Sequence, residues 1–144
     1  MSTRMIQMSR TVDAPPDRVY RAWSDPETVR QWLASSVEGS LIPGARSVLV
    51  FPRMRIEVDV LEADPNSRFK FRWTHPLDKQ SATEVTVVIT PMGYGSTVSL
   101  SDGPYEVSDE IILDEYARAI EIWAGALTQL RALVDYSIDL RKER

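Results

Sequence analysis

Over its first two thirds, the chain repeatedly alternates apolar and polar residues. A period of two places successive side chains on opposite faces of a strand. The clearest stretch is 54–61, in which Met54, Ile56 and Val58 alternate with charged residues. On this basis we predict six strands, at residues 5–12, 47–51, 54–61, 68–75, 83–90 and 97–100. Because short links join the later strands, we expect an antiparallel meander with one face on a core and the other in water.

Between the first and second predicted strands, the pattern predicts two short helices. Proline is tolerated in the first turn of a helix, so one helix can run from about Pro16 to Ser24. Asp25 is a natural N-cap and Pro26 fits the first helical position, so a second helix follows directly. Trp23 and Trp32 lie on the apolar faces of these two helices.

From about Asp109 to Lys142 the period changes to three or four residues, which is typical of an amphipathic helix. About 30 residues would make a helix roughly 45 Å long. The coiled coil is an alternative, but the strands need a cover for their apolar face. We therefore predict an α+β helix-grip fold over residues 1–144, a single domain in which a curved antiparallel sheet wraps the C-terminal helix. The apolar stripe consists of Leu113, Tyr116, Ile120, Trp123, Leu127, Leu130 and Val134.

Composition removes several classes of function. The chain of 144 residues has no cysteine, which excludes disulfides and thiolate zinc sites. Its formal net charge is -4 with interspersed signs, so nucleic-acid binding is disfavoured. No apolar run approaches the roughly 18 residues of a membrane span, and residues 1–10 lack the apolar stretch of a signal peptide. We expect a cytoplasmic protein that does not bind membranes.

Candidate chemistry is sparse. His75 is the only histidine, so a pair of histidine ligands or a histidine relay partnered by a second one is absent. The chain has no nucleotide-binding or nucleophile-elbow motif. The acidic stretch 102–110 lacks the spacing of a calcium loop, so we interpret it as a solvated lead into the last helix. We predict no metal and no cofactor, and an enzyme is not favoured.

Several stretches, in this order, resemble one family. They are residues 10–15 with Val19-Tyr20, 24–27 with Trp32, Pro43-Gly44, 60–65 with Arg68-Phe69 and Trp73, 95–100, and Trp123 with Leu127 and Leu130. The chain resembles the START-like (SRPBCC) superfamily and, within it, the family named after the activator of the heat-shock protein 90 ATPase. Ile122 stands where that family often has glycine, and the stretch 44–54 is short. The superfamily includes lipid and hormone binders, cyclases and co-chaperone domains, so the resemblance implies the fold more than the activity.

Our favoured hypothesis is that the domain binds a small apolar or amphipathic molecule between the sheet and the C-terminal helix. The strand 68–75 would form one wall, the helix the other, and the loop before the helix the mouth. Such a lining of rings with a few polar tips is usual for small-molecule pockets, although the same rings could simply fill the core. The predicted ligand-binding residues are Phe71, Trp73, His75, Tyr105, Tyr116, Ile120 and Trp123.

Two other classes of function stay open. One is a co-chaperone-like domain that binds a protein partner, but it would lack the second domain of the eukaryotic activators, so we expect no strong stimulation of the chaperone ATPase. The other is a cyclase or dehydratase using the same cavity, for which only Arg10, His75 and Tyr105 offer titratable groups. Gly125 in the helix leaves room for the close approach of another chain, so a homodimer is also open.

Overall fold

The computed structural model describes residues 2–74 and 81–142. Within them, seven strands form one antiparallel sheet in the order β1-β7-β6-β5-β4-β3-β2. Register irregularities between Arg4 and Ile6 and between Val60 and Glu62 help the sheet to curve. The strands are β1 (Thr3–Val12), β2 (Ser36–Glu38), β3 (Arg46–Val50), β4 (Arg55–Asp64), β5 (Arg68–Thr74), β6 (Ala82–Met92) and β7 (Gly95–Glu106).

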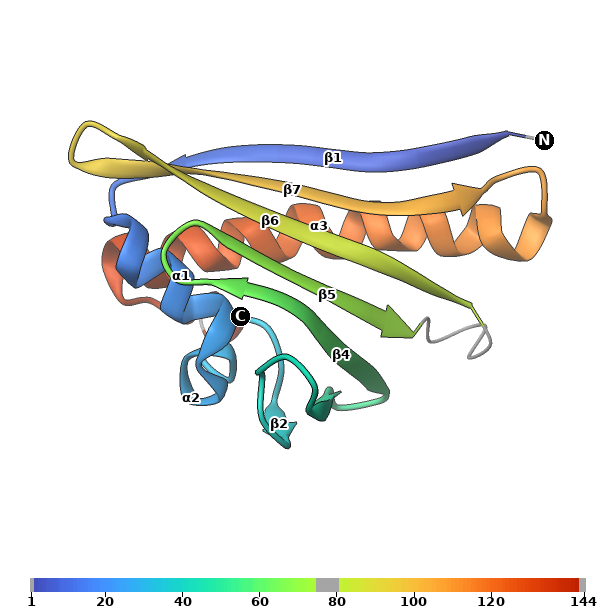
Figure 1. Cartoon of the computed structure of the whole chain (residues 1–144), viewed down its shortest axis with the longest axis horizontal. Coiled ribbons are helices and arrows are strands. Elements are labelled where there is room, and N and C mark those ends of the chain that lie inside the picture. Colours follow the sequence, from blue (N-terminus) through green and yellow to red (C-terminus); the bar gives the residue numbers. More distant parts are fainter. Residues whose placement is uncertain (1, 75–80, 143–144) are drawn as a thin grey trace.

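Four helical segments complete the described fold: α1 (Pro16–Ser24), α2 (Pro26–Val29), α3 (Glu110–Tyr136) and the short 3-10 turn η1 (Leu140–Lys142). Figure 1 shows α3 extending along one face of the sheet, with α1 and α2 near its C-terminal end. This arrangement confirms the predicted helix-grip fold and the two short helices after the first strand. Because α3 packs on the sheet, the coiled-coil alternative is wrong.

The sheet differs from its prediction at two places. β2 has only three residues, too few for an alternating pattern to show, so the sequence does not predict it. β7 continues through Gly103 and Pro104 to Glu106, although the sequence predicts a strand of 97–100. Glycine and proline are poor strand residues. Pairing with β1, in which Thr3 faces Glu106, extends the strand beyond its intrinsic preference.

The last helix is shorter than the predicted span to Lys142. Its start is as predicted, because the Asp109 side chain accepts hydrogen bonds from the backbone N–H groups of Ile111 and Ile112. It ends at Tyr136, where Ser137 adopts a left-handed conformation with φ of 57°. The Ile138 N–H then bonds to the Ala132 carbonyl, which completes a helix-ending motif.

The buried stripe of α3 is confirmed only in its second half, at Trp123, Leu127, Leu130 and Val134. In the first half, Leu113 and Ile120 are 46% and 36% exposed and Tyr116 is half-buried, whereas Glu115, which the pattern does not place on the stripe, is buried. Ala119, which the pattern does place beside the stripe, is buried as predicted. Residues seven apart drift by about 20° per heptad around a straight helix. A stripe assigned at seven-residue spacing therefore rotates, over several turns, away from the helix face that is buried.

No helix in the described residues is long and apolar enough to cross a membrane.

Candidate functional site

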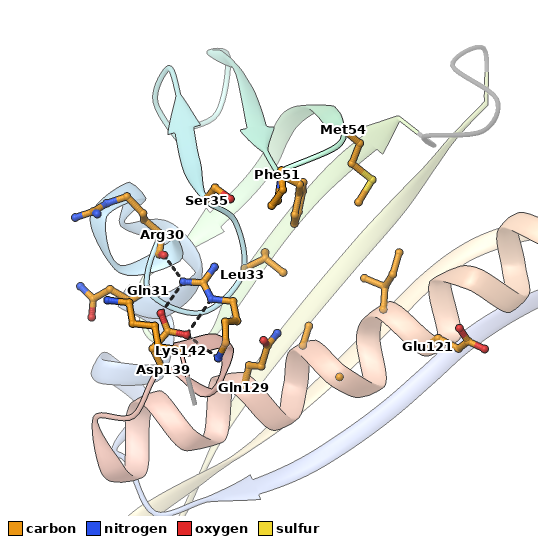
Figure 2. Close-up of a pocket in the computed structure, with 15 residues that line it drawn as sticks. Arg30, Gln31, Leu33, Ser35, Phe51, Met54, Glu121, Gln129, Asp139 and Lys142 are labelled. Atoms are coloured by element: carbon orange, nitrogen blue, oxygen red, sulfur yellow. Dashed lines mark hydrogen bonds and ion pairs between the residues drawn. The ribbon is translucent and has the colours of Figure 1, made fainter. Parts of the chain in front are cut away.

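A groove of about 680 Å³ runs beside α3, on the side that faces β3 and β4. The helix forms one wall, and the segments after α2 and after β3 form the other (Figure 2). The segment around η1 borders one end. The lining residues are Arg30, Gln31, Leu33, Ser35, Phe51, Pro52, Met54, Glu121, Ile122, Gly125, Ala126, Gln129, Asp139, Arg141 and Lys142.

The helical wall of the groove follows from helix geometry. Ile122, Gly125, Ala126 and Gln129 are spaced three and four residues apart and therefore share one face. A methyl group placed on Gly125 would meet no atom within 4 Å, so the space above this residue is open. Gly125 therefore widens the groove, although it costs the helix about 1 kcal/mol relative to alanine.

Arg141 closes one end of the groove by joining the C-terminal segment to the residues after α2. Its Nη1 and Nη2 atoms donate to the carbonyls of Ala34 and Arg30 at 2.8 and 2.6 Å. The same guanidinium makes a two-point contact with Asp139, at 2.9 Å from both Nε and Nη2. Hydrogen bonding to Arg141 holds the pKa of Asp139 below its ordinary value. This end is therefore built from matched charges (Figure 2).

A second constellation is buried on another side of α3. The Asp102 carboxylate is fully buried and accepts three hydrogen bonds. Thr83 Oγ1 donates to its Oδ1 at 2.5 Å, and both Tyr105 OH and Trp123 Nε1 donate to its Oδ2, at 2.6 and 3.0 Å. Trp73 Nε1 donates in turn to Thr83 Oγ1 at 2.9 Å. We call these five residues the Asp102 cluster.

Burial dominates the electrostatics of the Asp102 cluster. It raises the pKa of Tyr105 far above the ordinary value of 10, and the negative charges of Asp102 and Glu115 raise it further. Glu115 is 1% exposed and lies on α3. A hydroxyl held neutral in this way can donate to Asp102 at any physiological pH. The cluster ties β5, β6, β7 and α3 together.

The sequence-based interpretation of residues 102–110 is wrong for Asp102, which is in β7 and not in a solvated loop. The signal was available in the strand parity. Val98 and Leu100 are buried, and a strand places residue 102 on the same face. Glu115 gave no comparable signal, because its burial depends on how α3 is rotated against the sheet.

Among the predicted ligand-binding residues, Phe71, Trp73, Tyr105 and Trp123 are buried. The rings of Trp73 and Trp123 contact each other, with centroids 5.0 Å apart. Phe71 borders an inner void of about 20 Å³ together with Leu33, which also lines the groove.

The other three predicted residues lie differently. Tyr116 is half-buried, with its ring centroid 5.4 Å from that of Tyr105. Ile120 is on the exposed side of α3, and His75 lies outside the described residues. Tyr105 also borders a recess of about 380 Å³ with Thr83 and Ile112. None of the six predicted residues that the structure describes lines the groove. In residues 2–74 and 81–142, no group of three or more metal-ligating side chains comes together.

A family model described as "Activator of Hsp90 ATPase homolog 1-like protein" matches residues 13–135. The chain belongs to this family. The match covers most of the chain and confirms the resemblance derived from the sequence motifs. A comparison with curated proteins finds no match to this member of the Hsp90 ATPase activator homolog family.

Solved structures share the fold of this family member. MLL2253 from Mesorhizobium loti has a TM-score of 0.82 and 20% identity, over 94% of this chain and 99% of its own. The Aha1 dimer from Colwellia psychrerythraea has a TM-score of 0.81 and 15% identity, over 92% and 97%. DynU16, from the dynemicin biosynthetic locus, has a TM-score of 0.80 and 20% identity, over 94% of this chain. The chain spans 48% of the length of DynU16.

Proposed function

We propose that this domain binds a small amphipathic molecule in the groove between α3 and the β3–β4 side of the sheet. The observation that carries the proposal is the groove itself, whose volume of about 680 Å³ is in the range of small-molecule sites. Its walls combine apolar side chains such as Leu33, Phe51 and Ile122 with a few polar ones such as Gln129. That combination suits a ligand with an apolar body and a polar group.

The buried aromatic residues predicted from the sequence take a supporting role in this proposal. Because Trp73 and Trp123 contact each other, the ligand lies beside this pair and not between the two rings. Trp23 borders the inner void together with Leu33, and its ring centroid is 6.0 Å from that of Trp123, so tryptophan emission can report binding beside Leu33. Phe71 and Leu33 both border the inner void.

The test uses one position in two variants. Gly125→Phe places a ring in the open space of the groove, whereas Gly125→Ala adds only a methyl group. The protein and both variants are titrated with fatty acids, flavonoids and aromatic acids. Binding is followed by tryptophan fluorescence and by amide chemical shifts.

We expect at least one compound to bind, with shifts centred on residues 121–129 and 51–54. Gly125→Phe should abolish this binding, and Gly125→Ala should keep it. The proposal fails if no compound binds or if the phenylalanine variant binds as well as the unmodified protein.

A homodimer also remains a proposal. The Colwellia psychrerythraea neighbour was solved as a dimer, but at 15% identity it supports only the fold. Sedimentation equilibrium over a range of protein concentrations tests it, and a constant monomer mass would contradict it.

A further inference from the structure

The two ends of the groove differ in chemistry. Arg30, Asp139, Arg141 and Lys142 gather at one end, which we call the η1 end (Figure 2). Toward the other end the walls are mainly apolar, with Phe51, Met54 and Ile122 as the large side chains. We call this the Met54 end. A groove with one charged and one apolar end gives a bound amphipathic molecule a preferred direction.

At the η1 end, most of the charge is already matched. Arg141 is bonded to Asp139 and to two backbone carbonyls. Arg30 is paired with Glu27, with 2.8 Å between Nη2 and Oε2. The ammonium of Lys142 forms no ion pair with any other described residue, although its charge, like that of Arg141, helps to hold the pKa of Asp139 below its ordinary value. Because Asp139 is bonded directly to Arg141, the Lys142 ammonium is the cation that a ligand at this end can contact.

At the Met54 end the available charge has the opposite sign. Glu121 is exposed on α3 and forms no ion pair within the described part of the chain. It precedes Gln129 by eight positions, which corresponds to about 12 Å along the helix. An anionic group would be repelled near Glu121 and attracted near Lys142.

Gln129 supplies the polar contact between these two ends. Its side chain is half-buried and extends from α3 into the groove (Figure 2). It forms no hydrogen bond with another described side chain or backbone group. A glutamine amide has two N–H groups, and each can donate a hydrogen bond to a carboxylate oxygen.

From these observations we infer that the ligand is an amphipathic anion bound in one direction, with its anionic head at Lys142 and Gln129 and its apolar body over Phe51, Met54 and Ile122. The inference rests on the proposed function and adds the charge and the orientation of the ligand.

The test compares three probes with the same chain and different heads: decanoate, decanol and decyltrimethylammonium. Decanoate should bind tightest at low salt, roughly tenfold better than the cationic probe, and this difference should shrink as salt is added. Lys142→Glu should weaken decanoate roughly tenfold and leave decanol unchanged. Gln129→Leu should weaken decanoate a few-fold. Arg4→Glu makes the same charge change on β1, away from the groove, and should change neither probe.

Orientation is measured with decanoate that carries a nitroxide near its tail. The nitroxide should broaden the amide signals of residues 51, 53, 54 and 122 more strongly than those of 139–142. Equal broadening at both ends would contradict a single direction of binding.

The outcomes separate this inference from the proposed function. If decanol binds as tightly as decanoate and Lys142→Glu affects neither, the inference is wrong while ligand binding in the groove stands. The same holds if another compound binds but decanoate does not. If only vesicles of anionic phospholipid bind, the protein recognises a charged surface and the inference is overturned. If nothing binds, the inference and the proposed function fail together.

Discussion

The groove and the Asp102 cluster both use α3, but they satisfy their polar groups in opposite ways. In the cluster, Asp102, Thr83, Tyr105 and two indoles bond to one another and exclude water. In the groove, Gln129 and Lys142 have no such partners among the described residues, and a glycine keeps the space open. Buried polar groups need internal partners, whereas groups that face a ligand need to be available to it. The comparison indicates that the cluster stabilises the fold, and it supports our proposal that the groove binds the ligand.

If this division is correct, the largest loss of stability follows the removal of Trp123. Trp123→Ala should lower the free energy of unfolding by about 3–5 kcal/mol, because it leaves a cavity and removes a donor to Asp102. Trp123→Phe is the matched control. It keeps an aromatic ring and should cost less than half as much. Denaturant unfolding measures both, and a loss below about 1 kcal/mol for the alanine variant would show that the ring is not part of a tightly packed core.

Asp102→Asn should lower the free energy of unfolding by about 1–3 kcal/mol, since the amide has nearly the same shape but offers one acceptor oxygen in place of two. With the amide oxygen toward Tyr105 and Trp123, the NH₂ group would face Thr83 and the hydrogen bond that Thr83 donates to Asp102 would be lost. Asp109→Asn is the control, because asparagine is an equally good N-cap. Equal stability of the two variants in urea would contradict the role given to the cluster.

Alkaline pH tests the same cluster through Tyr105. The pKa of Tyr105 is raised in the folded state. Above about pH 10 the Tyr105 hydroxyl therefore loses its proton in the unfolded chain but keeps it in the folded protein. The contribution of Tyr105 to the free energy of unfolding should therefore be fully present below about pH 10. Above that pH it should fall by up to about 1.4 kcal/mol per pH unit. Tyr105→Phe should make the fall less steep, whereas Tyr94→Phe, at a fully exposed position, should not. Chemical unfolding at a series of pH values measures the slopes, and identical slopes would contradict the prediction.

The smallest change in stability is expected for a substitution in the groove, and this substitution should stabilise the protein. Gly125→Ala should raise the free energy of unfolding by about 0.5–1 kcal/mol, because alanine favours the helix and its methyl group meets open space. Gly95→Ala is the contrasting case, because there the methyl group would collide with the carbonyl oxygen of Val12 and destabilise the protein. Thermal unfolding compares the two. A destabilising Gly125→Ala would mean that this part of the helix is not open.

The candidate site could be predicted from the sequence only in part. Alternation in the strand 68–75 places Phe71 and Trp73 on the buried face, and the helical period does the same for Trp123. The rotation of α3 could not be read from its sequence in this way, so Ile120 was assigned to the buried face and Glu115 was not. The sequence predicts a site between the sheet and the helix but not the residues that line the groove, because Leu33, Met54, Ile122 and Lys142 share no local pattern.

By itself, the sequence determined the local structure and the family of this protein. Periods of two and of three to four residues define the longer strands and the last helix, and caps such as Asp109 define where the helix begins, because these signals act between neighbours in the chain. Only the tertiary structure decided where the groove lies, that Asp102 is sealed from water, and that Arg141 joins the C-terminal segment to residues 30 and 34. Each of these depends on contacts between residues far apart in the sequence, and such contacts exist only once α3 has taken one rotation against the curved sheet.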